Sequence, residues 1–211
     1  AGAGLARAKL SAANLSKANL AQAQISAADL SWAKLAEANL TDADCRQAKL
    51  FAANLTAANL TRADLTEAEL AGAKLATAYL REVNATAAKL HGAELRGANL
   101  EGANLREADL AGADLYKAYL ADAELTEADL FGANLTDANL KWANLRGANL
   151  RGANSARASL RQASLRGANL AGATVTDLQL AQAKDLEGAI MPDGSRYAGG
   201  IPEEIDELVG P

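Results

Sequence analysis

The sequence is built from one five-residue unit that repeats without a break over most of the chain. The unit is clearest at residues 98–102, where Ala, then Asn, then Leu precede two variable residues. Leu occupies 31 of the 36 positions whose number is a multiple of five between Leu5 and Leu180; the exceptions are Ile25, Cys45, Ala85, Ser155 and Val175. Ala stands two positions before each of these, except at Val83 and Leu178. A repeat this strict predicts one array of stacked units, which needs no second core.

A period of five fits neither an α-helix, at about 3.6 residues per turn, nor a long alternating strand. We therefore expect each unit to be a short extended segment followed by a turn. In the segment, Ala and Leu point to one side and Asn or Asp to the other. The variable pair is rich in Ser, Thr, Asp and Gly, which suit turns. Four units would close a coil of 20 residues with Ala and Leu inside, although the spacing alone leaves the number of sides open.

On these residues the chain resembles the pentapeptide-repeat family, whose A(D/N)LXX unit builds a right-handed quadrilateral β-helix. The resemblance covers about residues 3–191. It implies an all-β fold, a right-handed quadrilateral parallel β-helix (solenoid) of about nine 20-residue coils over residues 1–191. It also suggests a bacterial, cyanobacterial-type source. Leu180 to Leu186 spans six residues, so the register shifts by one there.

Residues 192–211 are expected to form a C-terminal turn followed by a capping or docking tail. The turn is predicted at Met191-Pro192-Asp193-Gly194-Ser195. Beyond it, Pro202, Glu203 and Glu204 suit the start of a short helix. Apolar residues follow at helical spacing: Ile201, Ile205, Leu208 and Val209.

A 20-residue coil would stack residues that are 20 apart, so the surface can be read as columns. One column alternates in charge: Lys9, Asp29, Lys49, Glu69, Lys89 and Asp109. Opposite charges at this spacing stabilise neighbouring strands by tenths of a kcal/mol per pair. A second column is uncharged: Asn19, Asn39, Asn59, Tyr79, Asn99, Tyr119 and Asn139. We expect its Asn side chains to bond along the rod, with Tyr79 and Tyr119 as secondary contact candidates.

The most unusual columns form one corner, where aromatic residues stand beside six glycines aligned from Gly72 to Gly172. The aromatic residues of this corner are Trp32, Phe51, His91 and Phe131. In one interpretation, glycine eases the turn and the rings simply occupy it. In the other, these four residues form a ridge that binds a partner, because contiguous exposed apolar surface marks interfaces.

Charge also separates along the chain, whose net charge is −5. Residues 101–137 carry nine acids and two bases, a balance of −7. Residues 138–176 then carry six bases and no acid: Lys141, Arg146, Arg151, Arg157, Arg161 and Arg166. These bases lie on several columns and would form a collar. We interpret the collar as solvated surface; contact with an acidic partner, nucleic acid or a membrane head group is the alternative.

Nothing in the sequence indicates catalysis. An enzyme needs polar groups that converge in a concave site, whereas this interior would be Ala and Leu and the exterior convex. His91 is the single histidine, and no zinc spacing, phosphate loop or nucleophile motif occurs. We expect no cofactor and no metal. Cys45 would be a buried, inert thiol, and the hydroxyl of Ser155 would need a hydrogen-bond partner in the core.

The favoured function is therefore a non-catalytic scaffold that binds another protein through the side or the ends of a rod. The alternative comes from the resemblance: some family members mimic DNA and protect gyrase. Those proteins favour Phe at the central inward position, where this chain has Leu, and the basic collar also departs from their acidic surface.

The expected partner is an unidentified protein, and nucleic acid is not expected. A homodimer through an end coil or the C-terminal tail is a further option. The sequence contains no run of 18 apolar residues, so no membrane span is predicted. We favour the cytoplasm, or the thylakoid lumen or periplasm if a leader was removed.

Overall fold

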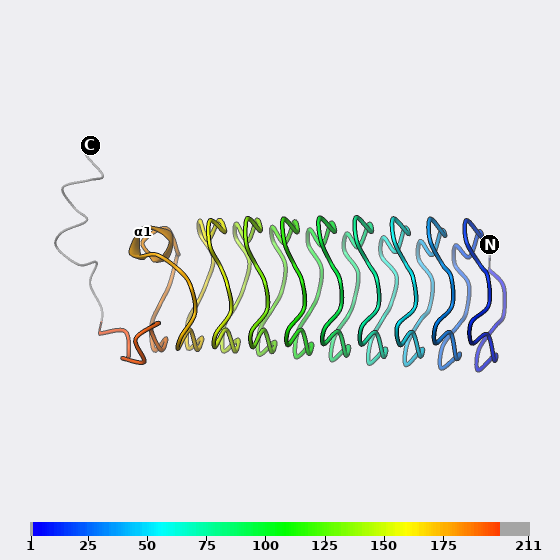
Figure 1. Ribbon diagram of the computed structural model, residues 1–211, viewed down its shortest axis with the longest axis horizontal. Helices are drawn as coiled ribbons and strands as arrows, with labels where there is room; N and C mark the ends of the chain where they lie inside the picture. The colour runs from blue at the N-terminus through cyan, green and yellow to red at the C-terminus, as the bar shows by residue number, and fades with distance from the viewer. Residues whose placement is uncertain (1, 199–211) are drawn as a thin grey trace.

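The computed structural model describes residues 2–198, which form a single straight rod of stacked coils (Figure 1). Parallel bridges join residues 20 apart, from Gly4 and Gln24 to Asn154 and Thr174. Each bridge falls on the Asn or Asp position of the unit, and no described strand is longer than one bridged residue. The coils between Gly4 and Thr174 therefore take 20 residues each, as the sequence predicts, and the fold is a right-handed quadrilateral β-helix.

Each turn is closed by a hydrogen bond from the Ala of one unit to the Leu of the unit before it. The amide of Ala33 donates to the carbonyl of Leu30 at 3.0 Å, and Trp32, between them, has a φ of 61°. This positive φ at the third residue, with a negative one before it, is the type II arrangement. The pattern recurs at the second variable residue of every unit from Gly2 to Gly172, so the variable pair does make the turn.

The interior is a continuous stack of Ala and Leu. These residues are buried from Leu20 to Ala173, and the exceptional Ile25, Cys45 and Ser155 are buried with them. Coils are joined by backbone hydrogen bonds such as that from the amide of Leu30 to the carbonyl of Lys49, at 2.7 Å. No buried side-chain nitrogen or oxygen in residues 2–198 lacks a partner.

The outward Asn and Asp side chains mostly stabilise the next turn. In the uncharged column, Asn39 and Asn59 accept from the amides of Thr41 and Thr61, both at 3.0 Å. The expectation that Asn side chains of this column bond along the rod is therefore wrong. A local Asx turn forms because the amide two residues on points at the side chain.

The register shift near the C-terminus is real, and it is absorbed by the helix α1, Asp177–Leu180. Bridges beyond it are 21 apart: Ser164 pairs with Asp185, and Asn169 with Ile190. Ile190 then pairs antiparallel with Arg196, which closes the described chain in a turn at residues 191–195. The expected helical segment at residues 201–211 lies outside the described residues.

Candidate interaction surfaces

The corner that carries Trp32, Phe51, His91 and Phe131 is exposed and holds one packed aromatic pair. The rings of Trp32 and Phe51 meet edge to face, with centroids 5.4 Å apart. Their side chains remain 61% and 46% exposed. A T-shaped pair that is still half in solvent presents a rigid apolar surface of the kind that anchors protein interfaces.

The structure does not bring the other two ridge residues into contact with this pair. Phe131 is 52% exposed and lies four coils from Phe51, or about 19 Å at about 4.8 Å per coil. Between them lie Ala71, Gly72, Ala111 and Gly112, together with His91, whose Nδ1 is 3.2 Å from a carboxylate oxygen of Asp109. The predicted ridge is thus an aromatic pair and a single Phe at two ends of a flat strip.

The secondary candidates, Tyr79 and Tyr119, are equally exposed at 55% each. They lie on one column, where Asn99 bridges both of them. Their rings are therefore two coils apart and make no ring contact with each other in the described structure. The two tyrosines offer separate contact points on one side of the rod.

The basic collar surrounds the rod, as its columns predict, but its members differ in their partners. Arg157 is bound to Asp137 through two hydrogen bonds of 2.7 and 2.9 Å. Arg166 lies 3.0 Å from Glu187. Within residues 2–198 no carboxylate lies within ion-pair distance of the remaining four: Lys141, Arg146, Arg151 and Arg161. The free positive charge of the collar is therefore confined to these four residues.

Two aromatic residues at the surface, the exposed Trp142 and the half-buried Tyr116, were missed in the sequence. Trp142 is 54% exposed beside the collar, on a column that is otherwise polar or glycine. Tyr116 has the guanidinium carbon of Arg96 at 4.6 Å and the ammonium of Lys117 at 5.1 Å from its ring centroid, which are cation–π distances. A search for aromatic residues at every turn, beyond the glycine-lined corner of Trp32, would have selected Trp142 as well.

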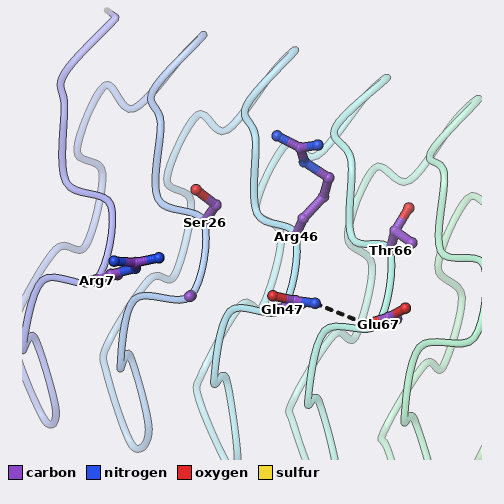
Figure 2. A pocket seen from close by; sticks show the side chains of 7 residues that line it. Arg7, Ser26, Arg46, Gln47, Thr66 and Glu67 are labelled. Atoms are coloured by element: carbon purple, nitrogen blue, oxygen red, sulfur yellow. Dashed lines mark hydrogen bonds between the residues drawn. The ribbon is translucent and has the colours of Figure 1, made fainter.

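The side near the N-terminus carries a shallow hollow lined by Arg7, Ser26, Arg46, Gln47, Thr66 and Glu67 (Figure 2). Gln47 and Glu67 close one edge through a 2.9 Å hydrogen bond. Arg46 turns away to Asp44, which accepts from Nε at 2.8 Å and from an Nη at 2.7 Å. This pairing, mainly the hydrogen bond from Arg46, holds the pKa of Asp44 below its usual value.

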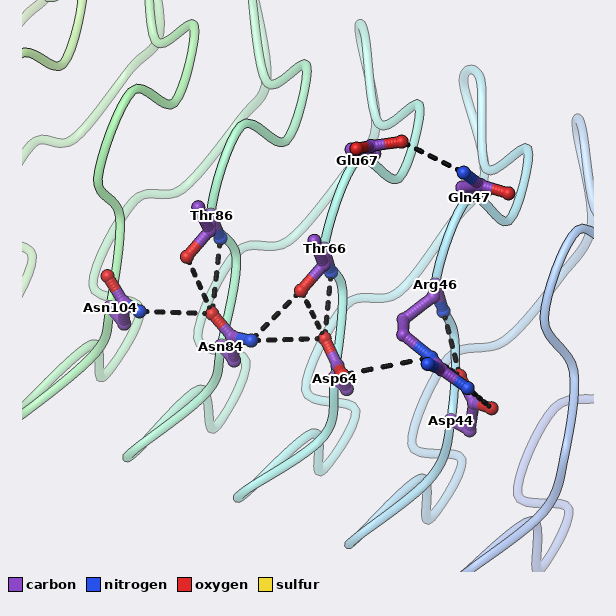
Figure 3. A network of polar contacts seen from close by, with 9 residues as sticks. All are labelled: Asp44, Arg46, Gln47, Asp64, Thr66, Glu67, Asn84, Thr86 and Asn104. Atoms are coloured by element: carbon purple, nitrogen blue, oxygen red, sulfur yellow. Dashed lines mark hydrogen bonds and ion pairs between the residues drawn. The ribbon is translucent and has the colours of Figure 1, made fainter.

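Beside this hollow, a ladder of polar side chains runs along the rod (Figure 3). Asn104 donates to Asn84 at 3.1 Å, and Asn84 donates to Thr66 at 2.9 Å. Thr66 in turn donates to Asp64, and Arg46 lies 3.9 Å from Asp64. Bonding along the rod thus occurs in this column, where Asn follows Asp, rather than in the uncharged column. The ladder satisfies its own polar groups and functions as structure.

The acidic segment of residues 101–137 is partly neutralised by bases from neighbouring coils. Four of its nine acids have an arginine within 4 Å, namely Glu101, Asp114, Glu124 and Asp137, and Asp109 lies within 4 Å of His91. Four of the five basic partners lie outside the segment: Arg81, His91, Arg96 and Arg157. The segment therefore presents less free negative charge than its sequence suggests.

Other chemistry is sparse in the described residues. Desolvation by burial raises the pKa of the Cys45 thiol to about 12, which agrees with an inert thiol. No group of three or more His, Cys, Asp or Glu in residues 2–198 could hold a metal ion. In the same residues, no helix has the length and apolar character that crossing a membrane requires.

The five-residue unit matches a known protein family. The family model for pentapeptide repeats matches in eight copies, over residues 3–42, 28–66, 43–81, 63–102, 98–137 and 138–177. The chain belongs to the pentapeptide-repeat family. Among curated proteins, none matches the sequence.

Solved structures extend the match to the fold of nearly the whole chain. HetL, a pentapeptide repeat protein involved in heterocyst differentiation regulation in the cyanobacterium Nostoc sp. strain PCC 7120, is 36% identical; the alignment covers 93% of this chain and 92% of HetL, with a TM-score of 0.67. QnrB1, a plasmid-mediated fluoroquinolone resistance protein, is 16% identical with a TM-score of 0.52, over 89% of this chain and 88% of QnrB1. QnrB1 therefore shares the fold alone.

A pentapeptide repeat protein from the thylakoid lumen of Arabidopsis thaliana is 31% identical, over 54% of this chain and 72% of that one, with a TM-score of 0.24. Of these proteins, the cyanobacterial HetL is the one that combines an identity of 36% with a match along nearly the full length of this chain.

Proposed function

We propose that this protein is a non-catalytic scaffold that binds another protein through the side of its rod, and that the Trp32–Phe51 pair is the anchor. The observation that carries the proposal is the edge-to-face packing of two rings that both remain half exposed. Large, rigid aromatic groups lose little conformational entropy on binding and dominate interface energetics.

The shape of the rod supports the same role. Its interior is filled with Ala and Leu along the described length, so no polar groups converge in a concave, enclosed site. Its surface hollows are shallow, and in the first of them Gln47 bonds to Glu67 while Arg46 bonds to Asp44 beside it. HetL, with the same fold, is involved in regulation, a role that a rigid binding surface can serve. We expect this protein to act in the cytoplasm.

The proposal is tested by placing charge on the aromatic corner. Phe51→Glu combined with Phe131→Glu should abolish capture of the protein's partner in a pull-down from native extract, quantified by mass spectrometry. The matched control is Gln22→Glu with Ala121→Glu, because these turn residues lie on the diagonally opposite corner of the coil. We call the Phe51→Glu, Phe131→Glu protein the ridge variant. If the parent and the ridge variant capture the same set of proteins, the proposal is contradicted.

The same variants test self-association. If the ridge joins two copies, size-exclusion chromatography with light scattering should show a dimer for the parent and the control, and a monomer for the ridge variant. If an end coil or the C-terminal tail joins them, the ridge variant stays dimeric.

The alternative, a DNA-mimicking regulator of an enzyme such as gyrase, rests on the acidic segment of residues 101–137. Glu107, Asp122, Glu127 and Asp129 are its acids without a basic side chain within 4 Å among the described residues. A DNA mimic needs a continuous line of such charges, and these four are interrupted by paired ones. A gyrase supercoiling assay distinguishes the two functions, because a scaffold without mimicry leaves supercoiling unchanged.

A further inference from the structure

One side of the rod near its C-terminal end has a basic groove, which is independent of the aromatic corner. We define the basic groove by the residues that line it: Trp142, Asn144, Arg146, Gln162, Ser164, Arg166, Lys184 and Asp185, together with Ala143 beneath them. Its volume is about 480 Å³. A second hollow shares Arg146 and Arg166 and extends the strip toward Arg106. The side chains come from successive coils, so the strip runs along the rod.

The strip carries an excess of positive charge. Arg146 and Lys184 have no carboxylate within ion-pair distance in the described part of the chain. Arg166 forms ion pairs with Glu187 at 3.0 Å and with Asp185 at 4.0 Å, and Arg106 forms one with Glu124 at 3.4 Å. Among the lining residues of the two hollows, four bases face two acids, Glu127 and Asp185. Lys141 and Arg161, at the adjoining turns, add two more bases.

The groove also offers an apolar surface. The indole of Trp142 is 54% exposed and makes no ring contact in the described structure. Gly167 lies at the floor of the strip, and the position that a Cβ would take there has a backbone nitrogen, 4.0 Å away, as its nearest neighbour. An exposed indole beside unpaired cations fits a segment that carries both carboxylates and aliphatic side chains.

The described chain ends beside this groove. Tyr197 and Ala198 line a third hollow together with Lys184, Asp185, Leu186 and Glu187, and two of those residues, Lys184 and Asp185, also line the groove. The sequence then continues with Gly199 and Gly200 and with a stretch that has four acids and no base: Glu203, Glu204, Asp206 and Glu207. Four aliphatic residues are interspersed among these acids: Ile201, Ile205, Leu208 and Val209.

The reach is sufficient. Five residues span at most about 17 Å when extended, so Glu203 can lie that far from Ala198. Arg146 and Lys184 are separated by two coils, which is about 10 Å. We propose that residues 201–209 bind within the same molecule to the basic groove, with their carboxylates near Arg146 and Lys184 and their aliphatic side chains against Trp142. The tether gives the segment an effective concentration in the millimolar range.

Trp142 provides a direct readout, because Trp32 is the chain's other tryptophan. In a Trp32→Phe background, acrylamide quenching of fluorescence then reports Trp142 alone. Neutralising the tail of the full chain (Glu203→Gln, Glu204→Gln, Asp206→Asn, Glu207→Gln) should raise the quenching constant by at least about twofold, because a tethered ligand covers the ring in most molecules. Arg146→Glu with Lys184→Glu should do the same.

Salt and a matched control complete the test. Raising NaCl to about 1 M should increase quenching of the parent and leave the neutral-tail variant unchanged, because salt screens exposed charges. Arg151→Glu, an exposed and equally unpaired base on another corner, should leave quenching as in the parent. A synthetic peptide of residues 199–211 should protect Trp142 of the neutral-tail variant. Equal quenching in the parent and the neutral-tail variant, or a difference that does not change with salt, would overturn the proposal. If the quenching of the parent depends on protein concentration, the tail binds to a second copy, and binding within one molecule is overturned.

Discussion

At the scale of single residues, every turn requires a left-handed backbone at its second variable position, and most of these positions are not glycine. Thr77 is the least suited of them, because it is β-branched and has a φ of 55°. Its hydroxyl donates only to the neighbouring carbonyl of Ala76, at 2.7 Å. The left-handed conformation costs an L-residue about 1–2 kcal/mol, and glycine avoids it.

We therefore expect Thr77→Gly to raise the free energy of unfolding by about 1 kcal/mol, measured by guanidinium denaturation. The control is the replacement of a glycine by alanine at the same turn position one coil later. Gly97 has a φ of 62°, and a side chain there would meet Thr77 only at an ordinary 3.7 Å. Gly97→Ala should thus lower stability through backbone strain alone. Equal stability of Thr77→Gly and the parent would show that the turn tolerates β-branching.

A second residue-scale prediction concerns acid. Hydrogen bonds hold the pKa values of Asp29, Asp44 and Asp137 below their ordinary value, through Ser31, Arg46 and Arg157 respectively. A lowered folded-state pKa stabilises the fold above the unfolded-state value of about 3.9, and that stabilisation is lost as the pH falls through the lowered pKa.

Stability should therefore fall as the pH drops below about 4, and Asp44→Asn should flatten part of that fall, because Asn does not titrate. Denaturation midpoints measured between about pH 6 and pH 2 would show it. Glu107→Gln, which removes a carboxylate that makes no ion pair in the described structure, is the control. Superimposable pH profiles of Asp44→Asn and the parent would refute the role of this pair.

At the scale of elements, α1 replaces a bridged segment, and one side chain compensates for the loss. Gln179 donates to the carbonyls of Ser155 and Ala158 at 2.7 and 2.8 Å. The side-chain oxygen Oε1 of Gln179 accepts from the amide of Thr176 at 3.0 Å and closes the capping box of α1. In regular coils, the Ala carbonyl at this place accepts from a backbone amide of the next coil, as Ala138 does from Ser159 at 2.9 Å.

Gln179→Ala should therefore destabilise this end of the rod by about 1–3 kcal/mol, because it leaves buried carbonyls unpaired and removes a cap. Hydrogen exchange should rise first in the coils around residues 155–175, while residues 20–100 stay protected, since opening of a repeat array is local. Gln182→Ala is the matched control, because that exposed side chain makes no hydrogen bond in the described structure. Uniform exchange along the rod would contradict this account.

The same element shows what the sequence could and could not reveal. The core and the turns were predictable because every unit repeats the same inward Ala and Leu and the same turn positions, so that Leu30 and Leu130 have the same surroundings. The inserted residue could be absorbed anywhere between Val175 and Leu186, and only the Thr176 and Gln179 pair, a capping-box signature, marks the place. Column neighbours were predictable, whereas side-chain pairing was not: column spacing alone could not tell that Trp32 meets Phe51 while His91 turns to Asp109.

At the scale of the whole molecule, all four sides of a coil present the same Ala and Leu to the core. The chain should therefore accept a deletion of five residues as readily as one of 20, provided that the deletion removes whole units. Removing residues 96–100 joins Leu95 to Glu101 and restores the unit. Everything downstream is then rotated by one side, but its own columns stay intact, and only contacts across the junction change, such as the ion pair of Arg81 with Glu101. Exposed pairs of this kind are worth about 0–1 kcal/mol.

We thus expect the deletions of residues 96–100 and 96–115 both to give folded rods, with cooperative unfolding in guanidinium and far-ultraviolet circular dichroism like the parent's. Deletion of Asn99 alone should be far more damaging, because removal of one residue turns the following Ala and Leu outward. The chain itself is consistent with this, since its one-residue register shift occurs where α1 leaves the coil. If the five-residue deletion unfolds like the loss of Asn99, the four sides are not equivalent, and the columns rather than the core would hold the coils in register.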